Sequence, residues 1–207
     1  MVRHGQYHVK AESADEKVLT ELGREQASAT GRRLRQLGHR FDRILISTQI
    51  RARQTAQLIL QAPPISSLSH QRGPDELEPS QIGEVVEDEM LEEGSPCHYV
   101  PTSRPKLDSD VVEAGAFRIR AAFRRYFRRR QPRPETKQNT AYTLIIGHAN
   151  VSRYFLLKGL QLPEAAWIRL TKFHASISWL TINPSGYVYM RCFSEIGHLP
   201  PRLQTRR

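Results

Sequence analysis

The chain has 207 residues, of which 39% are hydrophobic and 25% charged, a composition typical of a globular protein and not of a disordered one. No apolar run is long enough to cross a bilayer, so we expect no membrane span in this chain. The net charge of +10 predicts attraction to acidic partners, which include phosphorylated proteins, anionic membranes and nucleic acid. The length suits one ordinary domain, and we expect residues 1–207 to form a single domain.

Two further features concern the cellular compartment. The cysteines Cys97 and Cys192 are few for a protein of this size, which favours free thiols in a reducing compartment. Nothing near Met1 has the pattern of a signal peptide or a transit segment. We therefore expect no targeting or anchor segment within this chain.

In chain order, the first expected helix follows a polar loop at residues 9–18. Thr20 is a suitable N-cap for this helix, and Gly38 is placed to end it. A short apolar run at 44–46 predicts a buried strand, and a second helix is expected at about 50–61. This order of strand, loop and helix is typical of α/β proteins.

The middle of the chain has weaker signals. Residues 62–110 are rich in Pro, Ser, Glu and Gly, which predicts loops with at most one short helix. A helix is expected at 111–130 and should end at the proline-containing segment 131–134. Its arginines are most simply a solvated face, with partner binding as the alternative. These are Arg118, Arg124, Arg125, Arg128, Arg129 and Arg130.

The last third of the chain contains the strongest strand signal, at residues 142–147. A helix is expected from about 150 to 159, and strands at about 175–182 and 187–193 flank a turn at 183–186. Strands that alternate with helices predict an α/β fold with a mainly parallel sheet flanked by helices. The last hairpin should add an antiparallel edge to that sheet.

Three polar side chains each follow an apolar run that is predicted to be a strand or the remnant of one: His4, Arg51 and His148. Ligands of open α/β sheets bind beyond the carboxyl ends of the strands. If the three strands are neighbours, the side chains converge in one pocket, where guanidinium groups and the N–H groups of helix starts would bind a phosphate. The pattern therefore predicts an anion site.

The residue types in this predicted pocket suit phosphoryl transfer. A neutral histidine attacks phosphorus and forms a covalent intermediate, and arginines such as Arg3 and Arg51 stabilise the charge on the transferring oxygens. The leaving alkoxide needs a proton, which a partly buried carboxyl group with a raised pKa supplies. We expect Glu93 to be that acid, and the neighbouring Glu92 is its main competitor.

Each of these residues also has a plainer interpretation. Taken singly, His4 is more often a surface histidine, His148 a strand-end histidine, Arg51 a solvated helix residue and Glu93 one charge in an acidic run. His4 and His8 have the spacing of a metal pair, but no third ligand with supporting spacing appears, so no metal site is expected. Glycine patterns of nucleotide sites and basic residues interleaved with aromatic ones are absent from the sequence, so no nucleic-acid partner is expected.

Four motifs in this order resemble the histidine phosphatase superfamily, in its phosphoglycerate-mutase-like branch. They are Arg3-His4-Gly5, Leu19-Thr20-x-x-Gly23-x-x-Gln26-Ala27, Ser47-x-x-x-Arg51-Ala52-x-Gln54-Thr55 and Gly147-His148-Ala149. Further segments are similar to the mitochondrial serine/threonine protein phosphatases of that branch, so the resemblance covers nearly the whole chain. These segments are Gln6-Tyr7-His8, His148-Ala149-Asn150-Val151-x-Arg153-Tyr154, Trp167-x-Arg169-Leu170 and Gly197-x-x-Pro200-Pro201.

The resemblance implies a role for each candidate residue. His4 would be the nucleophile that forms phosphohistidine, Arg3, Arg51 and His148 would form the phosphate pocket, and His148 would also take part in catalysis. Glu93 matches the proton donor of the family. The implied enzyme is a metal-independent hydrolase of phosphoserine and phosphothreonine proteins that needs no cofactor. Its members form homodimers or larger homo-oligomers and are associated with the mitochondrial outer membrane.

One departure from the family concerns the strand that precedes the nucleophile. This strand normally has about five or six apolar residues, whereas only Met1 and Val2 precede Arg3 here. We therefore expect a truncated first central strand and weaker support under His4.

This departure and the basic charge keep two alternatives open. The first is a non-catalytic scaffold with a phosphatase fold. The second is a small-molecule phosphatase or mutase, although the short proline-rich stretch after Glu93 leaves little material for a lid.

Overall fold

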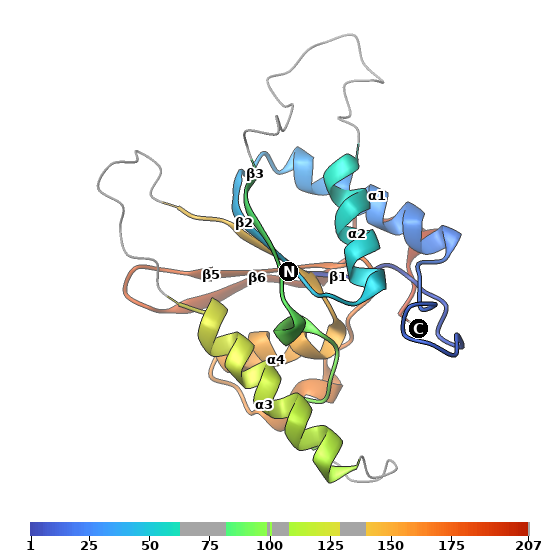
Figure 1. Cartoon of the computed structure of the whole chain (residues 1–207). Helices are drawn as coiled ribbons and strands as arrows, with labels where there is room; N and C mark the ends of the chain where they lie inside the picture. The colour runs from blue at the N-terminus through green and yellow to red at the C-terminus, as the bar shows by residue number, and fades with distance from the viewer. Residues whose placement is uncertain (63–81, 99, 101–107, 129–139, 207) are drawn as a thin grey trace.

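The structure is a computed structural model that describes residues 1–62, 82–98, 100, 108–128 and 140–206 (Figure 1). Its strands are β1 (Val2–Arg3), β2 (Phe41–Ile46), β3 (Ile82–Glu87), β4 (Thr143–Gly147), β5 (Ile177–Ile182) and β6 (Val188–Glu195). Its α-helices are α1 (Glu21–Gln36), α2 (Ile50–Gln61), α3 (Ser109–Tyr126) and α4 (Ala149–Gly159). Its 3-10 helices are η3 (Glu89–Leu91), η4 (Glu164–Arg169) and η5 (Pro201–Leu203).

The six strands form one sheet in the order β3-β2-β4-β1-β5-β6. The pairs β2–β3, β2–β4 and β1–β4 are parallel, whereas β1–β5 and β5–β6 are antiparallel. This confirms the α/β fold with a mainly parallel sheet and an antiparallel hairpin at one edge. β1 has only two residues and lies inside the sheet, where Val2 pairs with Ile146 of β4 and with Ile177 of β5.

Alternate residues of the strands pack against helices on opposite faces of the sheet, as the period of a β-strand requires. Ile44 and Ile46 of β2 lie in the core that contains side chains of α1 and α2. Leu45, between them, lies in the core formed with α3 and α4. Figure 1 shows α1 and α2 on one side of the sheet and α3 and α4 on the other. Helices on both faces explain why the buried parts of β2 and β4, residues 44–46 and 144–146, are continuous apolar runs.

The predicted ends of α1 are confirmed. The Thr20 side chain accepts a hydrogen bond from the Gly23 N–H at 3.0 Å, and α1 begins at the next residue. Gly38 has a φ of 63°, a left-handed conformation that glycine adopts without strain and that ends the helix. The second helix spans residues 50–61, as predicted.

The strand β3 was not predicted, because residues 62–110 were expected to form loops and at most one short helix. Residues 82–87 pair in parallel with β2 along its whole length and form one edge of the sheet. Edge strands are half solvated, and Glu84, Val85 and Glu87 are exposed. The residues Arg129 and Arg130 and the segment 131–134, which the sequence assigns to the end of the third helix, lie outside the described residues.

Two other expectations concern the cysteines and membrane-spanning helices. Cys97 and Cys192 are free thiols. Within the described ranges, no helix is both long and apolar enough to span a bilayer.

Candidate active site

The strands β2, β4 and β1 are neighbours, so the polar residues that follow them meet at one edge of the sheet. The ring centroids of His4, after β1, and His148, after β4, are 5.1 Å apart. Nε of Arg51, in the first turn of the helix after β2, lies 3.3 Å from Nε2 of His4. The predicted convergence of these three side chains is confirmed.

Two glycines permit the close approach of backbones that positions His4. A Cβ on Gly5 would lie 2.4 Å from the carbonyl oxygen of Gly23 in α1, and a Cβ on Gly23 would lie 2.0 Å from the carbonyl oxygen of Gln6. The Gly5 N–H donates to Oγ1 of Thr55 in α2 at 3.0 Å. The segment after β1 is therefore held between α1 and α2 by contacts that leave no room for larger residues.

The hydrogen bonds of His4 define which ring nitrogen carries the proton. Nδ1 lies 2.8 Å from the carbonyl oxygen of Gly5, which only accepts, so Nδ1 carries the proton. Nε2 therefore has its lone pair directed into the site, where it accepts from Arg51. Burial lowers the pKa of His4 well below its usual range, and the nearby His148, Arg3 and Arg51 lower it further. The ring is neutral, as a nucleophile must be.

His148 is also buried and neutral. Its Nε2 lies 2.7 Å from Oγ of Ser47, and its buried Nδ1 has no hydrogen-bond partner in the described part of the chain. Burial lowers the pKa of His148 well below its usual range, with contributions from Arg51 and Arg3. Buried polar groups without partners are uncommon and costly, so the unpaired Nδ1 is suited to a ligand atom.

Two arginines bring positive charge to the ring of His4. Arg51 lies over the ring of Tyr7, with 4.7 Å between its Cζ and the ring centroid, and Tyr7 packs edge-on against His4 at 5.0 Å. Arg3 donates to the carbonyl oxygens of Lys172 and Arg206, and its buried Nε–H has no partner among the described residues. Burial lowers the pKa of Arg3 to about 10. Both guanidinium groups remain cationic at neutral pH, and the site attracts an anion.

Glu93 lies opposite these cations. Its Oε1 accepts from the N–H groups of Gly94 and Asn150, both at 3.2 Å, and Asn150 is in the first turn of α4. Burial raises the pKa of Glu93 above its usual range, although the two hydrogen bonds and the charges of Arg3 and Arg51 oppose the rise. The structure therefore brings a carboxyl group with increased proton affinity to the same edge of the sheet.

The competing carboxylate has a different partner. Oε1 of Glu92 accepts a hydrogen bond from Oγ1 of Thr48, in the segment between β2 and α2. The charge of Glu92 also acts on Arg51. Glu93 instead is bonded to backbone N–H groups, and its charge acts on Arg3 and Arg153 as well as on Arg51. Of the two carboxylates, the geometry favours Glu93 as the one that serves the site.

Arg118 of α3 holds the segment that carries Glu93, a contact that the sequence did not reveal. Its guanidinium donates to four main-chain carbonyl oxygens of the segment that carries Glu93, at distances between 2.6 and 3.2 Å. The four belong to Glu89, Met90, Glu92 and Glu93. The interpretation of the arginines on this helix as a solvated face is wrong for Arg118, although Arg124 is exposed as expected. In the sequence, the one indication of these contacts was that Arg118 directly precedes Ile119, an apolar residue that is buried in the structure.

Arg153 is a second residue that received no role from the sequence. It follows Asn150 by one helical turn, and its Nη1 donates to Oδ1 of Asn150 at 2.8 Å while its Nε donates to the Leu170 carbonyl at 2.6 Å. Its charge acts on Glu93 and Arg3. Arg153 comes three residues after Asn150, which binds Glu93, so the helical spacing would have indicated that the two side chains are neighbours.

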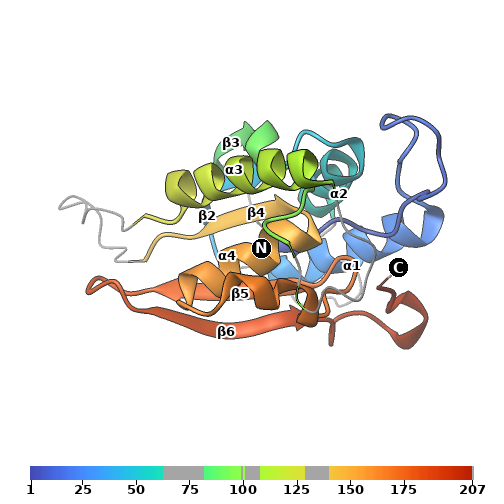
Figure 2. The ribbon, with the colours of Figure 1, turned by 90° about the horizontal axis from the view of Figure 1, so that it is seen from below.

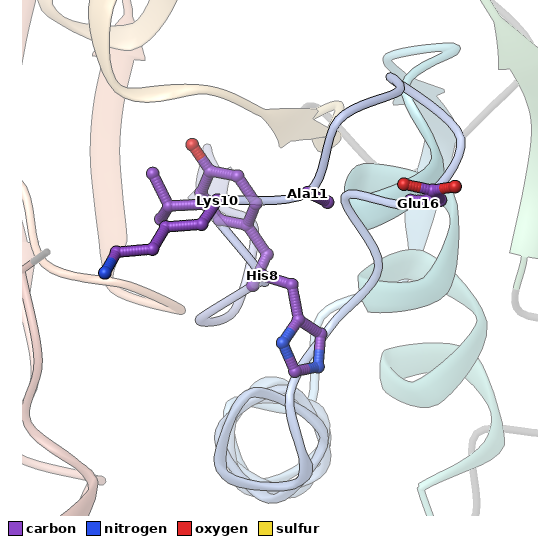
Figure 3. Close-up of a pocket in the computed structure, with 6 residues that line it drawn as sticks. His8, Lys10, Ala11 and Glu16 are labelled. Carbon is purple, nitrogen blue, oxygen red and sulfur yellow. The ribbon is translucent and has the colours of Figure 1, made fainter.

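A pocket of about 500 Å³ lies beside the site and shares the side chain of Tyr7 with it. Figure 3 shows the segment after β1 that forms it, with Lys10 and Glu16 on opposite sides. His8 lines this pocket, whereas the ring of His4 is buried among the groups described above. The described residues include no group of three or more His, Cys, Asp or Glu side chains arranged to hold a metal ion.

Comparisons with known proteins find relatives that match the whole chain. The serine/threonine-protein phosphatase Pgam5, mitochondrial, of Drosophila yakuba is 40% identical over 208 aligned positions that cover 100% of this chain and 66% of the relative. The protein of the same name from Drosophila melanogaster is 38% identical with the same coverage. The chain thus spans about two thirds of the length of these relatives.

A solved structure has a similar fold. The phosphoglycerate mutase of Plasmodium falciparum is 27% identical, with a TM-score of 0.58 and coverage of 97% of this chain and 91% of that one. A model of the histidine phosphatase superfamily (branch 1) matches residues 1–194. The resemblance found in the motifs is therefore confirmed, and the chain belongs to the histidine phosphatase superfamily, branch 1.

Proposed function

We propose that this protein is a phosphatase of phosphoserine and phosphothreonine proteins that works through a phosphohistidine on His4. The observation that carries the proposal is the unprotonated Nε2 of a neutral, buried His4, which accepts from Arg51, with an Nε–H of Arg3 and an Nδ1 of His148 that have no partner among the described residues. Such a site presents a nucleophile together with groups that bind an oxyanion.

The first step transfers the phosphoryl group to His4. The lone pair of Nε2 attacks phosphorus, and the bond from phosphorus to the oxygen of the substrate side chain breaks. Arg3, Arg51 and His148 contact the phosphoryl oxygens and stabilise their charge as the transition state forms. The hydrogen bond from Nδ1 of His4 to the Gly5 carbonyl holds the ring while the positive charge of the phosphorylated imidazole develops.

Glu93 serves the leaving group in this proposal. Its protonated carboxyl donates to the departing serine or threonine oxygen, which would otherwise leave as a costly alkoxide. In the second step the carboxylate accepts a proton from water as that water attacks phosphorus, and phosphate is released while His4 is restored. Burial that raises the pKa of Glu93 makes the acid form available for the first step. The arginines supply the positive charge that a metal ion provides in other phosphatases, so we propose that no metal is required.

Replacement of the nucleophile tests this function. His4→Ala should abolish hydrolysis of a phosphoserine peptide, whereas His39→Ala should hydrolyse it like the parent. His39 precedes β2 and thus lies at the opposite end of that strand from Arg51, so it is a matched histidine outside the site. Hydrolysis by His4→Ala at the parental rate would contradict the proposal. Activity that persists in a metal chelator would support metal independence.

The substrate class is a separate part of the proposal. Relatives named as serine/threonine-protein phosphatases support phosphoproteins, while the similarity to a phosphoglycerate mutase favours a small phosphate ester as the alternative. Turnover of a phosphoserine peptide, phosphoglycerate and an aryl phosphate at equal concentrations distinguishes them. We expect the peptide to have the higher kcat/KM of the two biological esters, and a preference for phosphoglycerate would contradict the assignment.

Cellular location and assembly complete the proposal. The names of the relatives support a mitochondrial location, and we propose association with the outer membrane. Cell fractionation with protease protection tests both. We also propose a single domain, supported by one sheet to which both ends of the chain contribute, and a homodimer or larger homo-oligomer. A single unfolding transition and light scattering after gel filtration test these two statements.

A further inference from the structure

The C-terminal segment from residue 199 to 206 returns to the site and contacts it from the side of Arg3. Leu199 and Leu203 are buried against Ala29 of α1, which places the end of the segment beside β1. Figures 1 and 2 show this end of the chain at the side where the segment after β1 lies. The carbonyl oxygen of Arg206 accepts a hydrogen bond from Arg3.

A buried histidine connects this segment to Arg3. Nε2 of His174 lies 3.0 Å from Nη2 of Arg3, and Nδ1 of His174 lies 2.9 Å from Oγ1 of Thr205. An arginine only donates hydrogen bonds, so Nε2 is the acceptor and the proton of the neutral ring is on Nδ1. Nδ1 therefore donates to Thr205. One tautomer of His174 satisfies both contacts, and the other tautomer would place two donors against each other.

The hydrogen bonds that Gln26 makes with the C-terminal segment also have a defined direction. Nε2 of Gln26 donates to Oγ1 of Thr205 at 2.8 Å and to the Leu203 carbonyl at 2.7 Å, while its Oε1 accepts from the N–H of Gln6 at 2.8 Å. Gln26 is fully buried in α1. The donor and the acceptor are thus determined for each hydrogen bond in the series Gln6, Gln26, Thr205, His174 and Arg3. Both ends of this series, Gln6 and Arg3, lie in the segment that carries His4.

The backbone next to this histidine is strained, and hydrogen bonds fix it on both sides. Ala175 has a φ of 53°, a left-handed conformation that is unfavourable for any residue with a Cβ. Its N–H bonds to the His4 carbonyl at 3.2 Å, and the His174 N–H bonds to the Thr205 carbonyl at 2.8 Å. Strain of this kind persists where surrounding contacts determine the geometry, and it is common at functional sites.

We infer that His174 is a positioning residue for Arg3, and that Thr205 of the C-terminal segment holds His174 in the tautomer that accepts from the guanidinium. The inference rests on the proposed role of Arg3 in binding phosphate. Two N–H groups of Arg3 donate to the Lys172 and Arg206 carbonyls and a third to His174, which leaves its Nε–H and one Nη2–H for a ligand. None of these hydrogen-bond partners is a carboxylate, so Arg3 keeps N–H groups for the phosphate although the charge of Glu93 acts on it.

Three variants and one control test the inference with an aryl phosphate as substrate and inorganic phosphate as competitive inhibitor. His174→Leu removes both contacts, whereas in His174→Gln the amide oxygen can replace Nε2 as the acceptor from Arg3. Thr205→Val removes only the hydroxyl, with little change in shape. Gln204→Ala is the matched control, because the exposed Gln204 lies in the same segment and, among the residues that the structure describes, bonds to the carbonyls of Leu199 and Pro201 and to no residue of the site.

We expect His174→Leu to raise both KM and the phosphate inhibition constant on the order of tenfold, as for the loss of a hydrogen bond to a charged group, with a smaller change in kcat. Thr205→Val should raise them by less, and His174→Gln and the control should remain near the parent. A role in folding alone would lower the melting temperature and leave the inhibition constant unchanged. If His174→Leu does not fold, the comparison of Thr205→Val with Gln204→Ala decides by the same two constants.

The outcomes separate this inference from the proposed function. If His4 is required for turnover while folded His174→Leu keeps both constants within about twofold of the parent, the inference is overturned and the function stands. If the parent neither turns over the ester nor binds phosphate, the function fails. Nitrogen NMR of the imidazoles then decides: the Nδ1–H tautomer of His174, perturbed by Thr205→Val, supports the positioning contact, and the Nε2–H tautomer overturns it.

Discussion

The two halves of the site are built in different ways. His4, Arg51 and His148 follow three adjacent strands, so the sheet itself brings them together. Glu93 instead follows a single 3-10 turn, and its position depends on one guanidinium from α3 that holds four carbonyl oxygens and on the first turn of α4. The half that we propose to bind phosphate is thus supported by main-chain pairing, and the half that we propose to donate the proton is supported by side chains.

This difference has a chemical counterpart. In the proposed mechanism the strand-end residues act on every phosphate ester, because every substrate contains the same phosphoryl group. Glu93 acts only on the leaving oxygen, so its contribution depends on how much that oxygen needs a proton. Substitutions in the two halves should therefore change activity in distinguishable ways.

The largest effect is expected in the strand-end half. Arg51→Gln removes a cation that contacts His4 and should lower kcat/KM on the order of a thousandfold, the upper range for one group that stabilises an oxyanion. The loss should be similar for the phosphoserine peptide and the aryl phosphate. Steady-state kinetics of Arg53→Gln provide the control, since Arg53 is in the same helix but its exposed side chain pairs with Glu87. Equal losses in both variants would contradict the assignment of Arg51.

The next effect concerns the acid. Glu93→Gln should lower kcat for the phosphoserine peptide on the order of a hundredfold. For an aryl phosphate with an acidic leaving group the loss should be much smaller, because that oxygen departs without a proton. The matched variant Glu92→Gln loses a carboxylate bonded to Thr48 and should keep most of its activity on both esters. A larger loss in Glu92→Gln than in Glu93→Gln would assign the acid to the competing residue.

A smaller effect is expected from the support of the acid. Arg118→Gln leaves carbonyl oxygens of the 89–93 segment without their donor, and we expect kcat for the phosphopeptide to fall by about tenfold, as for one charge-assisted hydrogen bond. The aryl phosphate should again be affected less, because the loss acts through Glu93. Arg124→Gln, on the exposed face of the same helix, should behave like the parent. An equal loss on both esters would show that Arg118 supports the whole site.

The last effect is on stability and its dependence on pH, not on activity. Burial holds the pKa of His174 at about 3, below the value near 6.5 of an unfolded chain. Between these values the unfolded chain binds the extra proton, so the free energy of unfolding falls as the pH drops below about 6.5, by up to about 1.4 kcal/mol per pH unit. The His174→Gln variant lacks the titrating imidazole, so its free energy of unfolding should fall less on acidification. Urea denaturation at several pH values measures the difference, and identical slopes would contradict a buried neutral His174.

The sequence predicted the strand-end half for a physical reason. Residues that follow adjacent parallel strands meet at the carboxyl ends of those strands, so the apolar runs before His4, Arg51 and His148 predicted their convergence on the condition that the strands are neighbours. The strand order of the structure meets that condition. Side chains that are brought together by helix packing have no comparable pattern in the local sequence. Arg118 has the same spacing as its exposed neighbours, and His174 precedes Ala175, whose left-handed φ has no signal in an alanine. The edge strand β3 was missed because solvated residues conceal its pairing with β2.

The phosphoryl group on His4 is the central claim, and trapping it is the most direct measurement. The parent protein would be mixed with a phosphoserine peptide or aryl phosphate, quenched rapidly in alkali, where phosphohistidine is stable, and mapped by mass spectrometry. We predict a single phosphorylated peptide that contains His4, and no such peptide in His4→Ala or in the absence of substrate. Phosphate on another residue, or turnover without any trapped phosphoenzyme under conditions that preserve it, would contradict the account.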